Sequence, residues 1–306
     1  MPPRERSEAV DIVARTMALR IISILFPLFA ICALGYVVAR RRAPDMTAAN
    51  RLNMDVFTPA LVFGALASSN VKPAQYLPLA GAALIVIVGS GLVGRVLAPA
   101  ISADPRTLVP PMTFNNCGNL GIPVALLAFG ADAVPAAVVL FALSNTLHFS
   151  FGAWYLDHHA KVWTVLRNPS VLAAIAGLLV SLLDIGIWEP LMQSIVMVGN
   201  IAIPLMLFGL GVRLATSRIT TLGFGLVVAI VRPIVGMLIA WALMIPFDLP
   251  ETQRALLLIF GALPPAVLNF MFSERYDQEP DKVASAVLVG NLFAILFLPI
   301  ALAFVL

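Results

Sequence analysis

Charged residues are scarce in this chain. Only 11% of its 306 residues are Asp, Glu, Lys or Arg, whereas 60% are hydrophobic and the mean hydropathy is +0.97. This composition excludes a soluble globular protein with an ordinary polar surface. The apolar blocks are long and continuous, which favours membrane helices over a barrel whose strands of about 10 residues would alternate in hydrophobicity. We therefore predict an all-α integral membrane protein with no soluble domain.

Cysteine and histidine are also rare. Cys32 and Cys117 fall inside predicted helices, and the three histidines at 148, 158 and 159 form no metal-binding motif. No nucleophile and base pair occurs at membrane depth, which argues against an intramembrane enzyme. We expect no disulfide, metal or other cofactor, and no nucleic-acid partner.

Ten apolar blocks are long enough to be spans, with edges defined to within several residues. The second block is short, so it indicates a span less strongly than the third or the eighth. The blocks cover residues 20–39, 53–69, 76–98, 107–130, 135–156, 169–188, 192–212, 221–247, 254–273 and 283–306.

Lysine and arginine predict the orientation of these spans, because cytoplasmic loops carry an excess of both. The loops after odd-numbered spans hold most of them, so both termini are expected to face outward. Basic residues before the first span oppose that orientation, and we expect translation to start at Met17. Because the first apolar run is long enough to span, it indicates a retained helix and not a cleaved signal. The basic loop residues are Arg40, Arg41, Arg42, Arg51, Arg95, Arg106, Lys161, Arg167, Arg213, Arg218, Arg275 and Lys282, against Lys72 and Arg254 in the other loops.

The two halves of the sequence repeat each other. Near-constant offsets across three pairs of spans are harder to attribute to chance than one match between apolar segments. Five spans per half is an odd number, so the halves must have opposite polarity in the membrane, as in inverted-repeat transporters. The matches are Pro59–Gly64 with Pro204–Gly209 (offset 145), Leu120–Ile122 with Leu263–Pro265 (143) and Asn145 with Asn291 (146).

The expected organisation is therefore a tail at 1–19, a first five-helix repeat at 20–156, a cytoplasmic linker at 157–168 and a second repeat at 169–306. Spans four and nine are interrupted by helix breakers and amide side chains. Backbone that leaves the helix at membrane depth needs protein around it or a cavity beside it, so interrupted spans point to the binding site.

The interrupted spans predict an anion site. A second half-helix beginning near Ile122 would aim its free N–H groups into the gap, and a helix N-terminus binds carboxylates without a cationic side chain. Simple kinking and close packing of helices is the alternative, and paired breaks beside asparagines favour binding. The expected substrate-binding residues are Asn115, Asn116, Asn119, Gly121, Ile122, Pro123, Pro264, Pro265 and Asn269.

Four other polar residues are candidates for coupling or support. Arg232 in span eight either neutralises the substrate or holds carbonyls freed by a kink. Asn145 and Asn291 fit hydrogen bonds between helices as well as substrate contact. His148 could titrate in a proton-coupled cycle, but a neutral histidine packed between helices is the favoured interpretation.

Several motifs resemble those of the auxin efflux carrier family, and the similarity extends over almost all of the chain. The segments are Leu52-Asn53 with Pro59, Asn116 through Gly121-Ile122-Pro123, Ile203-Pro204 with Phe208–Gly211, and Ala262-Leu263-Pro264 with Phe272–Tyr276. The chain looks like a bacterial member of that family.

The resemblance implies ten helices, with helices 1, 2, 6 and 7 as a scaffold, helices 3–5 and 8–10 as a transport domain, and helices four and nine crossing. It also implies elevator-type transport of an organic anion, homodimers through the scaffold, and a bacterial inner membrane location with periplasmic termini. Asn116 matches the asparagine that contacts the substrate carboxylate in plant carriers, while Pro123 and Pro264 match the crossing.

The sequence departs from the plant pattern in two ways. The long hydrophilic loop of many plant carriers is reduced to about residues 157–168, and no Asp or Glu lies between Asp55 and Asp104. The missing acid argues against auxin as substrate, and the resemblance to bacterial members implies malate, malonate or a similar carboxylate. The alternatives are a sodium- or proton-coupled carrier of the bile-acid or antiporter type, and an anion sensor that does not transport.

Overall fold

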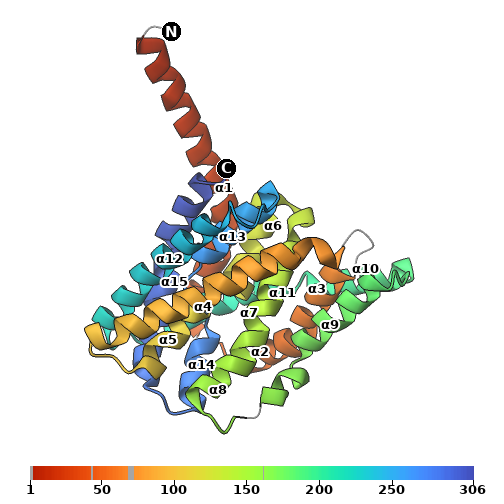
Figure 1. The fold of residues 1–306 in the computed structure, drawn as a ribbon, viewed down its shortest axis with the longest axis vertical. Helices are drawn as coiled ribbons and strands as arrows, with labels where there is room; N and C mark the ends of the chain where they lie inside the picture. Colours follow the sequence, from red (N-terminus) through yellow and green to blue (C-terminus); the bar gives the residue numbers. More distant parts are fainter. Residues whose placement is uncertain (1–2, 43, 68–71, 161) are drawn as a thin grey trace.

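The computed structural model describes residues 3–42, 44–67, 72–160 and 162–306, and over these residues the chain is helical throughout without a named strand (Figure 1). This confirms the predicted all-α class. Six helical segments are long and apolar enough to cross a membrane, which supports the integral membrane assignment. They are Arg15–Arg42, Pro73–Ala100, Ala131–Leu156, Glu189–Thr216, Leu222–Leu243 and Pro280–Ala303.

The helices of the first half include three short π-helical segments, which lie at η1, η3 and η5. The elements are α1 (Pro3–Arg42), α2 (Thr47–Leu52), η1 (Asn53–Phe57), α3 (Thr58–Leu66), η2 (Pro73–Tyr76), α4 (Leu77–Ala100), α5 (Pro105–Thr113), η3 (Cys117–Gly121), α6 (Ile122–Phe129), η4 (Ala131–Ala133), α7 (Val134–Leu147), η5 (His148–Gly152) and α8 (Ala153–Leu156).

The described residues of the second half contain no π-helical segment. The elements are η6 (Val162–Arg167), α9 (Pro169–Leu182), α10 (Glu189–Gly199), α11 (Ala202–Thr216), α12 (Leu222–Leu243), α13 (Glu251–Ala262), α14 (Leu268–Arg275) and α15 (Pro280–Ala303). The predicted spans at 53–69, 107–130, 169–188 and 254–273 correspond to shorter or interrupted helices.

The first helix is longer than predicted. It begins at Pro3 and continues to Arg42, so most of the expected tail is continuous with the first span. Its N-terminal part projects away from the helical body (Figure 1). Translation from Met17 stays a prediction.

Two groups of helices make most of the packing contacts. In one group α1 packs on α11, and α3 packs on α9 and α10. In the other, α12 packs on α4, α13 and α15, while α4 packs on α5. The segment η3 lies where these groups meet, because it contacts α11 of the first group and α13 of the second.

Glycines allow the closest approaches within each group. A side chain at Gly211 of α11 would collide with the backbone carbonyl of Cys32 in α1. Gly236 of α12 and Gly261 of α13 face each other in the same way, each meeting the carbonyl of the other. Small residues let membrane helices pack backbone to backbone, where dispersion contacts replace the hydrophobic effect.

Candidate functional site

Two interrupted helices cross through their backbones. Between α5 and η3 the chain leaves the helix at Phe114–Asn116, and between α13 and α14 it leaves the helix at Leu263–Ala266; Phe114 and Leu263 are extended. Asn115 lies opposite Pro265 in an isolated antiparallel bridge. The Asn116 N–H donates to the Pro264 carbonyl (2.7 Å) and the Ala266 N–H donates to the Phe114 carbonyl (2.9 Å). Each interruption thus satisfies polar groups that lipid could not.

The two hydrogen bonds are equivalent under a two-fold exchange. Because Asn115 faces Pro265, the exchange relates positions 150 apart, and it maps the Asn116 bond onto the Ala266 bond. The sequence match between spans four and nine has an offset of 143, so it is out of register by seven residues. The crossing is therefore pseudo-symmetric, with a different correspondence from the one predicted.

Prolines create only one of the two interruptions. Pro264 and Pro265 provide no N–H groups, and Leu263 before them is extended, as a residue preceding proline prefers. In the first interruption no proline occupies Phe114–Asn116; side-chain amides hold the open ends there. The Asn115 Nδ2 donates to the Phe260 carbonyl of α13 (2.7 Å), and the Asn269 Nδ2 donates to the Phe114 carbonyl (3.0 Å).

The predicted position of the second half-helix was wrong. It begins at Cys117, five residues before Ile122, because the chain resumes a π-helical turn directly after the bridge. Gly121 and Ile122 lie inside the continuous η3–α6 segment. Pro123 occupies the first turn of α6, where it is buried away from the crossing. The expectation that Pro123 sits at the crossing is therefore corrected, whereas Pro264 does lie there.

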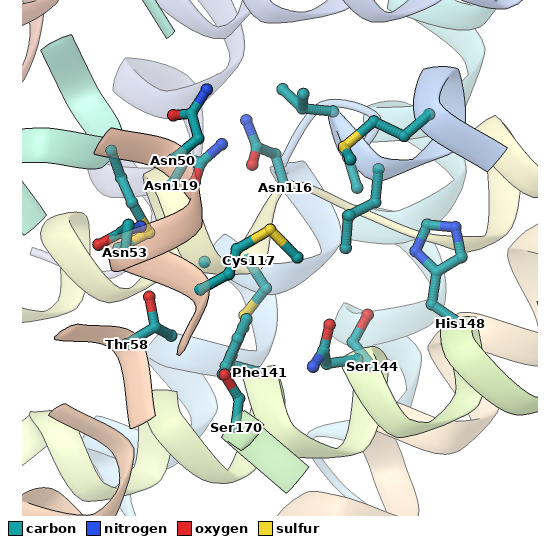
Figure 2. Close-up of a pocket in the computed structure, with 18 of the residues that line it drawn as sticks. Asn50, Asn53, Thr58, Asn116, Cys117, Asn119, Phe141, Ser144, His148 and Ser170 are labelled. Atoms are coloured by element: carbon teal, nitrogen blue, oxygen red, sulfur yellow. The ribbon is translucent and has the colours of Figure 1, made fainter. Parts of the chain in front are cut away.

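A cavity of about 230 Å³, lined by both polar and apolar side chains, opens beside the crossing (Figure 2). In Figure 2, Asn50, Asn53 and Asn119 lie on one side of it and Ser144 and His148 on the other, with Cys117 between them. Its walls come from α2, η1 and α11 of the first packing group, from η3 and the segment before α14, and from α7 and η5.

Both half-helices start at this cavity. Cys117, Gly118 and Asn119 form the first turn of η3, and Val267 and Leu268 start α14; all five line the cavity. The first N–H groups of a helix have no partner within it, and the helix dipole makes this end electropositive. Two such ends at one cavity favour a small anion, carboxylates included.

All three π-helical segments reach the cavity. Asn53 and Asp55 belong to η1, and His148 and Phe149 belong to η5, while η3 supplies its first turn. A π-segment widens the helix and re-aims side chains, and such segments occur frequently at functional sites.

Five of the predicted site residues line the cavity: Asn115, Asn116, Asn119, Asn145 and His148. The others lie behind it. Pro264, Pro265, Asn269, Arg232 and Asn291 are buried and form the support of the crossing, whereas Gly121, Ile122 and Pro123 are buried within the η3–α6 segment.

Asn116 connects the cavity to this support. Its Nδ2 donates to Asn291 Oδ1 (2.7 Å), and Asn291 Nδ2 donates in turn to the carbonyls of Pro265 (3.1 Å) and Val287 (2.8 Å). An amide nitrogen carries two protons, so one N–H of Asn116 remains for a ligand. Asn291 therefore orients Asn116. Of the two roles predicted for Asn291, these contacts favour a hydrogen bond between helices over substrate contact.

Arg232 holds the carbonyls freed by the second interruption. This fully buried side chain donates from Nη1 to the carbonyls of Gly261 (2.9 Å) and Leu263. Between the two predicted roles, the contacts favour the tie to a broken helix, and Arg232 does not line the cavity.

His148 is held between aromatic rings. It stacks on Phe114 with ring centroids 4.1 Å apart and an interplanar angle of 8°, and a tilted contact places Phe272 at 4.8 Å. Its buried Nε2 has no hydrogen-bond partner among the described residues. The ring thus supports the extended Phe114 segment at the edge of the cavity.

The sequence did not identify several cavity residues. Asn50, Ser144 and Ser170 contribute polar groups, and Arg213 contributes a positive charge from α11. Arg213 was assigned to a loop because it follows an apolar run, whereas the structure places it in the last turn of α11. The two glycines just before it, Gly209 and Gly211, were the sequence signal for a closely packed helix there. Polar residues at the ends of spans are ambiguous until the tertiary fold is known.

These features define an integral membrane protein whose crossed, interrupted helices form a polar site between two helix groups. Comparison with known proteins agrees with that class. A family model described as "Membrane transport protein" matches residues 158–302. A protein of Rhizobium meliloti (strain 1021), provisionally named a malonate transporter, is 24% identical over 298 residues, which cover 90% of this chain and 92% of that protein.

Plant proteins match over a shorter stretch. Auxin efflux carrier component 8 of Arabidopsis thaliana is 27% identical over 153 residues, 47% of this chain and 41% of the carrier. Auxin efflux carrier component 1b of Oryza sativa subsp. japonica, also provisionally named, is 29% identical over 151 residues, 47% of this chain and 27% of the carrier. The resemblance to the auxin efflux carrier family is confirmed, and the relatives that match this chain are named as transporters.

Proposed function

We propose that this chain is a secondary transporter that carries a small carboxylate, such as malonate or malate, across the bacterial cytoplasmic membrane. The observation that supports this proposal is that two half-helices begin at one cavity beside a backbone crossing. Neutral amides and helix dipoles can hold an anion and release it, because neither forms a permanent ion pair. The name of the Rhizobium relative supports malonate as the first substrate to test.

We further propose ten helices arranged as two inverted repeats with crossed helices four and nine. The equivalence of the Asn116 and Ala266 hydrogen bonds supports this arrangement, since a two-fold axis in the membrane plane would relate them. On this arrangement, and from the distribution of basic loop residues, both termini face the periplasm. The repeats correspond to residues 20–156 and 169–306, joined by 157–168.

An elevator-type motion is the proposed mechanism. Helices α1–α3 and α9–α11 would form the scaffold, and α4–α8 with α12–α15 the moving domain. The cavity has walls from both groups, with Asn53 and Arg213 on the first and Asn116 and Val267 on the second. Sliding one group past the other would expose the same crossing to either side in turn. A homodimer through the scaffold would anchor the stationary part.

Counterflow in proteoliposomes tests the proposal. Vesicles loaded with unlabelled malonate or malate should accumulate the labelled acid, and Asn116→Ala should reduce this exchange at least about tenfold, because one charge-assisted hydrogen bond contributes about 1.5–3 kcal/mol. Asn200→Ala, an exposed asparagine outside the cavity, is the matched control. Thermal unfolding separates loss of transport from loss of fold.

Two outcomes would contradict the proposal. Saturable binding without exchange would identify a sensor, and undiminished exchange in a folded Asn116→Ala protein would remove Asn116 from the site. Exchange that requires sodium or a pH gradient would instead specify the coupling ion.

A further inference from the structure

Arg213 places a full positive charge at the cavity. It comes from a different group of helices than the asparagines of the crossing. It belongs to α11, whereas the helix starts belong to η3 and α14. Asn50 and Asn53 line the cavity from the same packing group as Arg213, and α11 contacts both α2 and η1. The cavity therefore has a neutral, dipolar wall at the crossing and a cationic wall at α11.

The guanidinium of Arg213 is incompletely paired. Its Nη1 is buried and has no hydrogen-bond partner among the described residues. Its carbon Cζ lies over the Phe270 ring at 5.8 Å from the centroid, a cation–π contact that uses none of its N–H donors. An ionisable side chain within a membrane helix is costly, and one with unused donors indicates a missing anionic partner.

The acidic groups of the protein do not supply that partner within the cavity. Glu274 acts on Arg213 only through its electrostatic field, and the described residues include no ion pair between them. Asp55 also lines the cavity but is exposed to solvent. Cys117 and His148 are the other titratable groups that line the cavity; Cys117 is a buried neutral thiol, and the His148 ring is held between Phe114 and Phe272.

We propose that Arg213 binds the second carboxylate of a dicarboxylate whose first carboxylate lies at the crossing. This inference rests on the proposed function and specifies its substrate class. The planar fork of arginine matches a carboxylate with two parallel hydrogen bonds, which a single ammonium cannot do. A monocarboxylate would bind only to the helix N-termini and amides at the crossing, and it would leave the Arg213 guanidinium unpaired. Arg213 is thus the residue that makes the site select dianions.

Paired ligands of equal carbon skeleton test this selectivity. Malonate, succinate and glutarate are each compared with their monomethyl esters, which keep one carboxylate, by calorimetric binding to the detergent-purified protein. The unsubstituted protein should prefer at least one diacid over its ester. Arg213→Gln should reduce that preference about tenfold or more by weakening the diacid and leaving the ester unchanged. Arg213→Lys should retain part of the preference, since the charge remains.

Controls separate this inference from the proposed function. Arg218→Gln removes an exposed arginine five residues away and should change nothing. An unchanged preference in a folded Arg213→Gln protein overturns the role of Arg213. Equal binding of diacids and esters to the unsubstituted protein also overturns it, while leaving a carboxylate transporter intact. If neither diacids nor esters bind, the proposed function fails together with the inference.

Discussion

Asn119 and Asn269 occupy equivalent positions on the two half-helices, yet only Asn269 donates its side chain to the crossing. The pairing of Asn115 with Pro265 makes residues 150 apart equivalent, which relates these two asparagines. Asn269 is buried and donates to the carbonyls of Phe114 and Ala266, both at 3.0 Å. Asn119 is half-buried, lines the cavity and makes no side-chain hydrogen bond with a described residue. One asparagine supports the site, and the other is available to a ligand.

We predict that Asn119→Ala impairs binding, whereas Asn269→Ala impairs stability. Asn119→Ala should weaken carboxylate binding about fivefold to tenfold with unchanged stability, because it removes a cavity donor worth about 1–1.5 kcal/mol. Asn269→Ala should lower the free energy of unfolding by about 1–3 kcal/mol, because it removes two buried hydrogen bonds that each contribute about 0.5–1.5 kcal/mol. Binding calorimetry and thermal unfolding measure the two effects. A stable Asn269→Ala protein with impaired binding would contradict this division.

Arg232 should be a stability residue. Replacing it by Met removes two hydrogen bonds to carbonyls of the second interruption, and each bond from a charged donor contributes about 1.5–3 kcal/mol. We expect a large fall in the unfolding temperature of Arg232→Met in detergent, with Arg218→Met as the exposed control. A variant that unfolds normally but no longer binds carboxylates would instead make Arg232 a ligand.

The contact between α1 and α11 should depend on Gly211. A leucine there would drive its Cβ into the Cys32 carbonyl and force the two helices apart. We expect Gly211→Leu to lose at least about 1–3 kcal/mol of stability, the usual range for overpacking. Gly223→Leu in α12 is the matched control, since no atom lies within 4 Å of a Cβ there. Equal unfolding temperatures for the two variants would count against a tightly packed α1–α11 pair.

Glu279 should give the protein a stability term that depends on pH. The pKa of its carboxyl is lowered below 4.5, first by the hydrogen bond from Lys282 and then by the one from Thr107 (2.6 Å). Since the folded pKa is the lower one, the stabilisation is present above pH 4.5 and is lost as the pH falls through the folded pKa. The carboxyl is largely exposed, so the effect is modest.

Thermal unfolding of Glu279→Gln across this pH range checks the expectation. The substituted protein should be less stable than the unsubstituted one at neutral pH, and the two should converge in acid. Thr107→Val removes the second donor and should give a smaller difference of the same sign. Parallel curves at every pH would show that Glu279 acts only through packing.

The sequence predicted the fold class, the interrupted helices and much of the cavity wall. Composition alone indicates membrane helices, and the adjacent prolines at 264 and 265 remove two backbone donors, which favours an interruption. Asn115, Asn116 and Asn119 were also recognisable, because amide side chains in an apolar segment require partners. These signals are local, so they can be read without knowing which helices meet.

The register of the crossing was not predictable in this way. Gly121, Ile122 and Pro123 resemble a helix breaker, yet the interruption lies at Phe114–Asn116, where only tertiary hydrogen bonds hold the chain open. Pro123 fits the first turn of a helix, where its missing N–H costs nothing. Arg213 was misassigned for a related reason, since its burial depends on α2 and η1 packing beside it.

The hydrogen bonds at the crossing join main-chain atoms, so a scan of alanine substitutions cannot remove either of them. The peptide N–H of Asn116 is present whatever side chain follows it, and the same holds for Ala266. Replacing one of these amides by an ester, through an α-hydroxy acid incorporated during translation, deletes a single donor and leaves every side chain in place. The core of this site is therefore accessible to backbone chemistry and hidden from conventional mutagenesis.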